Sequence, residues 1–224
     1  MTLDLKNGKL RRFFHKEIIL NMKKLLIATS NQSKKKEIIH GLAQLSKIGV
    51  QLLTLDDLEI IGEPIESGST FEENAKIKAK FYADQAKIPT LADDGGLMID
   101  ALNGAPGVIS RRWPGYEATD RELIDYALEK MKHIQKEERT AQLKTCVCFF
   151  NPVSKYISCV EQSIAGKMSE KPITYNTNGY PFRALFIVQE FNKFYDELTQ
   201  DEHQRINHRL KAIQQLIPII ENNI

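Results

Sequence analysis

Residues 23–47 read KKLLIATSNQSKKKEIIHGLAQLSK, and this stretch sets the class of the fold. The run Lys24–Thr29 is typical of a short buried strand, and a polar segment follows it at once. An apolar stripe then recurs at helical spacing over residues 33–47, formed by Ile38, Ile39, Leu42 and Leu45. The stretch therefore predicts a strand, a polar turn and an amphipathic helix.

Strand and helix signals continue to alternate after this unit. Residues 50–54 (VQLLT) predict a second strand, and the acidic connection at 56–69 is too polar for the core. Thr70 and Glu73 have the spacing of a capping box, which predicts the start of another helix. A short strand at 89–92 should follow that helix.

The second half of the chain adds a hairpin. Residues 140–150 alternate in polarity, and 155–160 (KYISCV) follow as a second strand. A further strand is centred on 184–188, and a last helix should run from Thr199 until Pro218 ends it. Early alternation with a later hairpin predicts an α/β fold, with a mixed sheet and helices on both faces.

Composition excludes several classes of protein. The chain has 224 residues, 42% of them hydrophobic, and a net charge of +2. This balance demands neither a nucleic-acid nor a membrane partner, and no apolar run reaches the roughly 18 residues of a membrane span. Residues 1–22 resemble a loose extension or a translation start assigned too early, so we expect the folded domain to occupy 23–224.

The cysteines indicate a reducing compartment. Cys146, Cys148 and Cys159 lack the CxxC spacing of zinc and redox sites, and their odd number argues against a disulfide framework. We expect three small buried residues in a cytoplasmic protein.

The first candidate site is the segment Thr29-Ser30-Asn31-Gln32-Ser33-Lys34, between a strand end and a helix start. Backbone N–H groups at a helix N-terminus attract anions, and Lys34 adds a full positive charge. The segment lacks the glycines of a P-loop. A helix cap followed by solvated lysines is the alternative.

The second candidate is Asp93-Asp94-Gly95-Gly96, at the expected carboxyl end of a strand. Adjacent strand residues point to opposite faces, so one carboxylate should enter a cleft. Magnesium prefers oxygen ligands from one or two carboxylates plus substrate phosphates, and the loop at 59–66 offers a second acid. An ordinary Asp-Gly turn is the alternative.

The third candidate is His208 with Arg209 on the last helix. On a continuous helix, His208 lies almost opposite the apolar stripe and Arg209 lies beside it. A solvated histidine is the alternative.

Taken in order, four segments resemble the inosine triphosphate pyrophosphatase family, which removes deaminated purine nucleoside triphosphates. They are TSNQSKKKEI (29–38), ESGSTFEENAKIKA (66–79), LADDGGLMIDALNGAPGVISRRWPG (91–115) and NHRLKAI (207–213). The resemblance implies an elongated, twisted sheet with a nucleotide cleft between two lobes. It also implies a homodimer, to which the loop at 113–114 could contribute an apolar contact.

The resemblance assigns roles to particular residues. It implies that the segment Thr29–Lys34 and Lys78 contact the phosphates, and that Lys34 assists catalysis. Asp94 matches the metal-associated acid that activates water, with Asp93 beside it. The candidates for a second metal-binding acid are Glu59, Glu63 and Glu66.

The base-binding residues are implied in the same way. His208 and Arg209 match a pair that hydrogen-bonds purine carbonyl groups. Two departures weaken substrate contacts: Gly95 replaces a serine, and His203 stands where relatives often carry a lysine. Asn207, before the His-Arg pair, also replaces a serine.

The largest departure lies in a turn where relatives carry a glycine/aromatic motif followed by Asp-Pro. Tyr180 and Phe182 preserve aromatic surfaces for stacking on a base. Arg183 replaces the aspartate and Ala184 the proline, and arginine offers no hydrogen-bond acceptor. Local rewiring with the pocket retained and an altered base preference both stay open.

The implied reaction is hydrolysis of ITP, dITP and XTP to the monophosphate and pyrophosphate, with Mg²⁺ or Mn²⁺ as cofactor. A pyrophosphatase with another base preference and a nucleotide-binding protein without turnover are the alternatives.

Overall fold

The computed structural model describes residues 22–177 and 179–224. The expected N-terminal extension therefore lies outside the described residues, except for Met22.

One mixed sheet runs through the whole described fold, in the strand order β2-β1-β3-β4-β5-β6-β7. Its strands are β1 (Lys24–Ala28), β2 (Gln51–Thr54), β3 (Thr90–Ile99), β4 (Thr140–Phe150), β5 (Ile157–Met168), β6 (Phe186–Val188) and β7 (Lys193–Phe194). Strand β1 is parallel to β2 and β3, whereas every later pairing is antiparallel. The prediction of a mixed sheet is confirmed.

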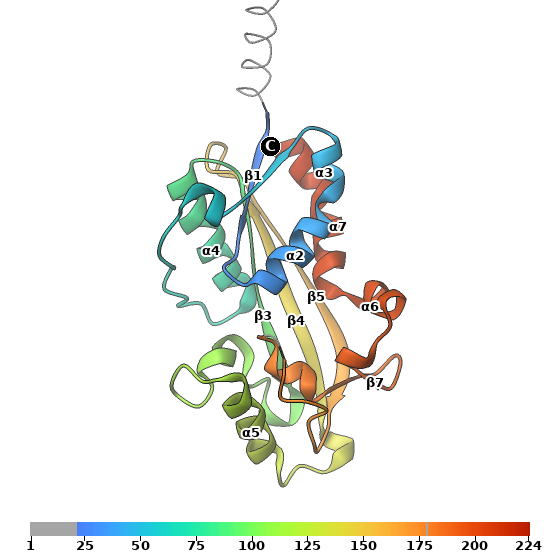
Figure 1. Cartoon of the computed structure of the whole chain (residues 1–224). Helices are drawn as coiled ribbons and strands as arrows, with labels where there is room; N and C mark the ends of the chain where they lie inside the picture. The colour runs from blue at the N-terminus through green and yellow to red at the C-terminus, as the bar shows by residue number, and fades with distance from the viewer. Residues whose placement is uncertain (1–21, 178) are drawn as a thin grey trace, which may run out of the picture.

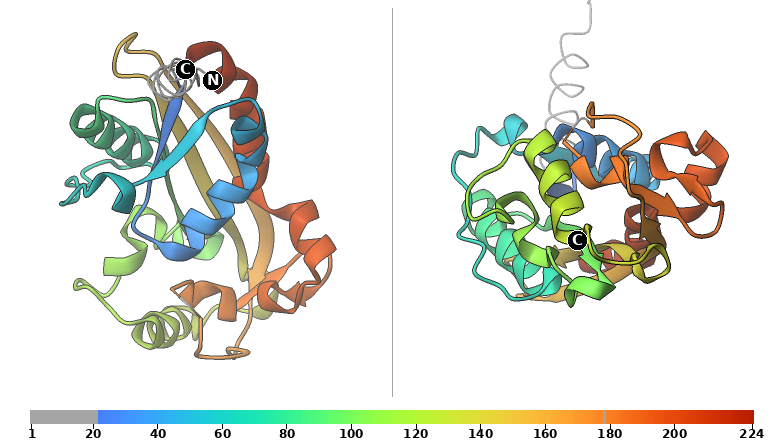
Figure 2. Two further views of the ribbon diagram at one scale, coloured as in Figure 1. Left: turned by 45° about the horizontal axis from the view of Figure 1, so that its top comes forward. Right: turned by 90° about the horizontal axis from the view of Figure 1, so that it is seen from below.

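Helices cover both faces of this sheet (Figures 1 and 2). The α-helices are α2 (Gln32–Gly41), α3 (Ala43–Lys47), α4 (Phe71–Ala86), α5 (Asp120–Met131), α6 (Gln200–Ile206) and α7 (His208–Asn223). Strand β1 explains the two layers, because Leu25 and Ile27 pack under α2 and α7 while Leu26 and Ala28 pack under α4. A strand buried on both faces reads as a continuous apolar run.

A third core cluster forms a separate lobe around α5. It joins the far ends of β3, β4 and β5 to the turn at 180–186, through residues such as Leu97, Leu143 and Phe186. The long strands pass from one lobe to the other (Figure 1). Both lobes are therefore built on the same sheet.

Strand β3 does not end at the paired aspartates, as the sequence predicted, but continues to Ile99. The glycines permit this continuation. A Cβ atom on Gly95 would lie 2.4 Å from the carbonyl oxygen of Lys144, and one on Gly96 would lie 2.4 Å from Ser110 Oγ. Close approach of the neighbouring β4 backbone explains Gly95, and close approach of the 3-10 helix Gly107–Arg112 explains Gly96.

The last helix also differs from the prediction. It is interrupted at Asn207, whose side chain accepts a hydrogen bond from the Leu210 N–H at 3.0 Å and so caps α7. Pro218 lies inside α7 and does not end it. Pro218 and Gln214, one turn earlier, are both exposed, so water can satisfy the carbonyl group that proline leaves unpaired.

The cysteine prediction was wrong for one pair. Cys148 and Cys159 face each other in the β4–β5 register and form a disulfide bond, with Cα atoms 4.1 Å apart. Cys146 lies buried beside them. Counting cysteines could not reveal that a hairpin places two of them opposite each other.

Among the described residues, no helix combines the length and the apolar character needed to cross a membrane.

Candidate active site

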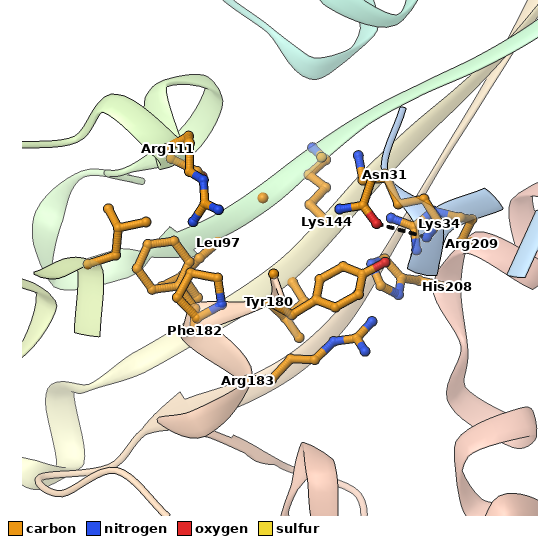
Figure 3. A pocket seen from close by; sticks show the side chains of 17 residues that line it. Asn31, Lys34, Leu97, Arg111, Lys144, Tyr180, Phe182, Arg183, His208 and Arg209 are labelled. Atoms are coloured by element: carbon orange, nitrogen blue, oxygen red, sulfur yellow. Dashed lines mark hydrogen bonds between the residues drawn. The ribbon is translucent and has the colours of Figure 1, made fainter. Parts of the chain in front are cut away.

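A cavity of about 280 Å³ lies where the two lobes meet, and Figure 3 shows the side chains that line it. Its lining comes from the β1–α2 junction, β3, the 3-10 helix Gly107–Arg112, α5, β4, the turn at 179–183 and the start of α7. The polar members are Asn31, Lys34, Ser110, Arg111, Lys144, Tyr180, Arg183, His208 and Arg209. The cavity therefore brings residues of all three candidate sites together, the second of them through Gly95 and Gly96. Asp93 is not part of the lining but makes ion pairs with Lys34 and Arg209, which are.

The β1–α2 junction is organised by Asn31. Its side-chain oxygen accepts hydrogen bonds from the backbone N–H groups of Ser33 at 2.9 Å and Lys34 at 3.1 Å, which caps α2. Thr29 Oγ1 in turn accepts from the Asn31 N–H at 3.3 Å. This capping directs the Lys34 ammonium group toward the paired aspartates.

The other residues of this junction lie outside the cavity lining. Ser30 is exposed and donates to Glu63 at 3.2 Å, and Gln32 is exposed as well. Ser33 is half-buried and serves the cap through its backbone. The structure thus brings Asn31 and Lys34, out of the predicted segment, to the cavity wall.

Asp93 points to the face of the sheet that α2 and α7 cover. Its Oδ2 atom lies 3.0 Å from Lys34 Nζ and 3.1 Å from Arg209 Nε, and its side chain is fully buried. Burial raises the pKa of Asp93, but Lys34 and Arg209 outweigh burial and hold the pKa well below its usual range. Asp93 is therefore an anion at neutral pH, and it positions two cations.

Asp94 points to the opposite face, under α4. Lys78 Nζ lies 2.8 Å from Asp94 Oδ1 and 2.9 Å from Glu66 Oε2, so one ammonium group serves two carboxylates. The Asp94 Oδ2 atom is buried and has no hydrogen-bond partner among the described residues. Burial raises the pKa of Asp94, although Lys78 opposes the shift. The pKa of Lys78 is raised despite its burial, because Asp94 and Glu66 both attract its proton.

The three candidate loop acids are placed differently. Glu66 shares Lys78 with Asp94, and Glu63 accepts the bond from Ser30. Glu59 takes a left-handed conformation with φ of 50° at the end of a short 3-10 helix, Asp56–Leu58. Glu66 is thus the loop acid that the structure brings to Asp94.

The turn that follows Gly179 forms the other end of the cavity. The Arg183 guanidinium group lies 3.6 Å from the centroid of the Tyr180 ring and 4.4 Å from that of Tyr195. Phe182 packs edge-on against Trp113, with ring centroids 6.0 Å apart. Tyr180 and Phe182 both line the cavity, and their role as stacking surfaces for a base stays a prediction.

His208 and Arg209 are both buried, and His208 is not the solvated side chain that a continuous helix would make it. The break at Asn207 restarts the helix, so both residues occupy the first turn of α7. His208 Nδ1 has no partner among the described residues, and burial next to Arg209 and Arg183 holds the pKa of His208 well below its ordinary value. A neutral imidazole at the cavity wall can offer one donor and one acceptor.

His203 is separated from the central cavity. Its Nε2 atom is hydrogen-bonded to the Tyr195 hydroxyl group at 2.9 Å, in a neighbouring hollow behind Arg183. Gly95, in contrast, does line the central cavity.

Sequence reasoning missed Glu37. This carboxylate accepts hydrogen bonds from Arg209 and from Arg183, the latter at 3.4 Å, and so links the turn to α7. Its position three residues after Lys34 on α2 was the available signal in the sequence, but a carboxylate next to a run of lysines is also typical of a solvated helix face. Lys144 and Arg111 also line the cavity, although the sequence indicated only a polar strand face and a loop for them.

The arrangement has three chemical parts. The junction and Lys78 supply positive charge, Asp94 supplies a carboxylate oxygen that is free to accept a proton or a cation, and the turn supplies aromatic surfaces with N–H donors nearby. A ligand with phosphates at one end and an aromatic base at the other would contact all three.

Comparisons with known proteins show which chains are similar to this one. A model of the Ham1 family matches residues 25–219. The chain is 40% identical over 194 residues to a dITP/XTP pyrophosphatase from Thermus thermophilus, covering 87% of this chain and 90% of the relative. It is 36% identical over 198 residues to a dITP/XTP pyrophosphatase from Lactobacillus acidophilus, covering 88% and 96%.

Solved structures are similar as well. A HAM1 protein from Coxiella burnetii superposes with a TM-score of 0.78 at 31% identity, covering 90% of this chain and 100% of that structure. The Ham1 protein of Staphylococcus aureus gives a TM-score of 0.76 at 27% identity, covering 90% and 100%.

Proposed function

The chain belongs to the Ham1 family, and from this premise we propose that it hydrolyses dITP, XTP and ITP to the monophosphate and pyrophosphate. The observation that carries the reaction is the Asp94 Oδ2 atom, which is buried without a partner beside Lys78. A buried acceptor of this kind is costly unless a ligand completes it.

Asp94 is the proposed general base. Its raised pKa makes it a stronger base than an exposed aspartate, and Lys78, 2.8 Å from its Oδ1 atom, opposes the rise. The proton of an attacking water passes to Asp94 as the bond from the water oxygen to the α-phosphorus forms. The bond between the α-phosphorus and the bridging oxygen breaks, and pyrophosphate leaves.

Magnesium fits the residues around Asp94. The free oxygen of Asp94 and the carboxylate of Glu66 are oxygen donors on either side of one lysine, and Mg²⁺ prefers one or two carboxylates plus phosphate oxygens. When bound, the ion supplies positive charge at the phosphate oxygens. Mn²⁺ takes the same donors, and Glu59 and Glu63 are less well placed than Glu66.

Lys34 and Lys78 are proposed to offset the charge that develops on the phosphates. They approach from opposite faces of β3, because Lys34 pairs with Asp93 and Lys78 with Asp94. Asn31 caps the helix at the proposed phosphate-binding junction, and Thr29 and Ser33 take part in the hydrogen bonds of this cap. Ser30 and Gln32 flank Asn31 in the same proposed segment.

His208 and Arg209 are proposed to recognise the base, with Tyr180 and Phe182 as stacking surfaces. Donors from a histidine and an arginine suit the 6-oxo group of hypoxanthine or xanthine. Adenine presents an amino donor at that position, and unpaired buried donors cost about 1–3 kcal/mol.

The homodimer remains part of the proposal. The Trp113 ring packs against Tyr126 and Phe182 within its own lobe. We therefore propose that the apolar contact between subunits involves Ile61 and Ile65, whose exposed fractions are 89% and 86%. Light scattering of the purified chain tests this assembly.

The activity is tested by pyrophosphate release with Mg²⁺ from XTP, ITP, dITP and the common ribo- and deoxyribonucleoside triphosphates. We expect the oxopurine substrates to exceed ATP by about 5–150-fold in kcat/KM, which corresponds to the cost of the unpaired donors. A chelator should abolish release. A folded protein that releases no pyrophosphate from any substrate contradicts the proposal.

A further inference from the structure

The Arg183 side chain lies between two tyrosine rings at the base end of the cavity. Its guanidinium group is 3.6 Å from the Tyr180 ring centroid and 4.4 Å from that of Tyr195, and the side chain is 15% exposed. Figure 3 shows Arg183 on one side of the Tyr180 ring, with Asn31 and Lys144 on the other side. A base that stacks on Tyr180 from the cavity is therefore separated from the positive charge by a single ring.

Among the described residues, Arg183 has one carboxylate within ion-pair distance, and Asp196 lies near enough to interact with its charge from the neighbouring hollow. The ion-pair partner of Arg183 is Glu37, which lies 3.4 Å away and also accepts a hydrogen bond from Arg209. Two guanidinium groups thus share one carboxylate on this side. Asp93 compensates Arg209 further, but it also serves Lys34.

The cavity wall is rich in donors. None of the described residues that line it carries a carboxylate, and its charged side chains are Lys34, Arg111, Lys144, Arg183 and Arg209. The Asn31 side-chain oxygen is occupied by the helix cap, which leaves its amide N–H groups as donors. The Tyr180 hydroxyl group and His208 Nδ1 are buried and have no hydrogen-bond partner in the described part of the chain, and these two groups can donate or accept.

Such a wall distinguishes oxopurines by the acceptors they present. Xanthine has carbonyl groups at positions 2 and 6, hypoxanthine has one at position 6 alone, and guanine has an amino donor at position 2. Xanthine also loses a ring proton more readily than hypoxanthine, because its two carbonyl groups delocalise the charge. An acceptor-rich base that can carry negative charge is therefore the best match for these donors and for the nearby cation.

Resting on the proposed function, we infer that Arg183 is a specificity-determining residue that makes this pyrophosphatase selective for xanthine nucleotides over hypoxanthine nucleotides. It acts through the Tyr180 stacking surface, by placing positive charge behind the ring that holds the base. The neighbouring hydrogen-bond donors of the cavity wall bind the second carbonyl group of xanthine, which hypoxanthine lacks.

Equilibrium binding of the two monophosphates tests this inference without requiring turnover. Trp113 is the single tryptophan of the chain, and its ring centroid lies 6.0 Å from that of Phe182 in the cavity wall, so its fluorescence reports on the pocket. We expect xanthosine monophosphate to bind about tenfold more tightly than inosine monophosphate, as one screened charge interaction across a ring allows. In Arg183→Gln that ratio should fall to within about twofold, whereas Arg183→Lys, which keeps the charge, should retain most of it.

Arg121 provides a matched control, because its guanidinium group also stacks on a tyrosine, 5.0 Å from the Tyr175 ring centroid, away from the cavity. The Arg121→Gln variant should leave the ratio unchanged. Equal affinity for both monophosphates in the wild type overturns the inference, and so does an Arg183→Gln variant that weakens both equally. Hydrolysis of ITP and XTP at equal kcat/KM would overturn the selectivity and leave the proposed activity intact. Selective binding of xanthosine monophosphate without hydrolysis of any substrate would support the selectivity and overturn the proposed activity.

Discussion

The two faces of β3 carry consecutive aspartates with opposite fates. On the face under α2 and α7, Asp93 is fully buried between two cations, and its pKa is held below the usual range. On the face under α4, Asp94 shares a single cation with Glu66, and its pKa is raised. Identical side chains thus acquire different chemistry from the ratio of positive to negative groups around each.

The difference shows how one strand can carry a positioning residue, Asp93, on one face and the proposed general base, Asp94, on the other. The Asp93 face has more cations than carboxylates and fixes Lys34 and Arg209 in place. The Asp94 face has more carboxylates than cations. Each aspartate has one buried oxygen without a hydrogen-bond partner among the described residues, Asp93 Oδ1 and Asp94 Oδ2, so the balance of charge is what separates the two faces. Three substitutions test whether this division is real.

The largest expected effect is on turnover in Asp94→Asn. Removing a general base lowers kcat by about 10²–10⁴-fold. The free energy of unfolding should change little, because the variant removes a partly desolvated charge while Glu66 still pairs with Lys78. Pyrophosphate release and urea unfolding measure the two quantities, and a variant that unfolds as easily as Asp93→Asn would break the comparison.

Asp93→Asn should have the largest effect on stability. Breaking a buried ion pair by removing one partner costs about 3–5 kcal/mol. Because the folded-state pKa of Asp93 lies below the unfolded value of about 3.9, its contribution is complete above that pH and is lost as the pH falls toward the folded-state pKa.

Urea unfolding of wild type and Asp93→Asn over a range of pH measures this difference. It should be constant from neutral pH down to about 5 and shrink in more acidic solution. A difference that grows on acidification would show that Asp93 is not the anion described here.

A smaller effect is expected for Glu66→Gln, which tests whether the surplus of carboxylates under α4 holds the cofactor. Loss of one oxygen ligand should raise the Mg²⁺ concentration for half-maximal activity by about 10–100-fold. Glu72→Gln is a suitable control, since Glu72 pairs with Lys76 on the exposed surface of α4. If both variants require the same Mg²⁺ concentration as wild type, Glu66 is not a ligand.

Much of the fold followed from local patterns. The apolar run of β1, the capping box at Thr70 and the alternating hairpin each depend on neighbours in the sequence, and the structure has all three. The continuation of β3 through Gly95 did not follow, because it depends on how closely β4 approaches across the sheet. Likewise, the pairing of Cys148 with Cys159 depends on hairpin register.

The candidate site shows the same limit. Residue types and resemblance indicated Lys34, Asp94 and His208, but helical periodicity placed His208 in solvent, because the interruption at Asn207 has no strong local signal. Glu37 was missed for a related reason. Its importance arises from Arg183 and Arg209, which are 146 and 172 residues away in the sequence.

The distance along the chain between these partners has a consequence for biosynthesis. Arg209, on the last helix, joins Asp93, 116 residues earlier, and Glu37 near the start of the described fold. During synthesis the phosphate-binding junction and the paired aspartates emerge long before the guanidinium group that links them. Contacts so far apart in sequence form late in folding. A nascent chain therefore lacks the proposed base-recognition site until α7 docks, and we expect a ribosome-bound intermediate to be catalytically silent.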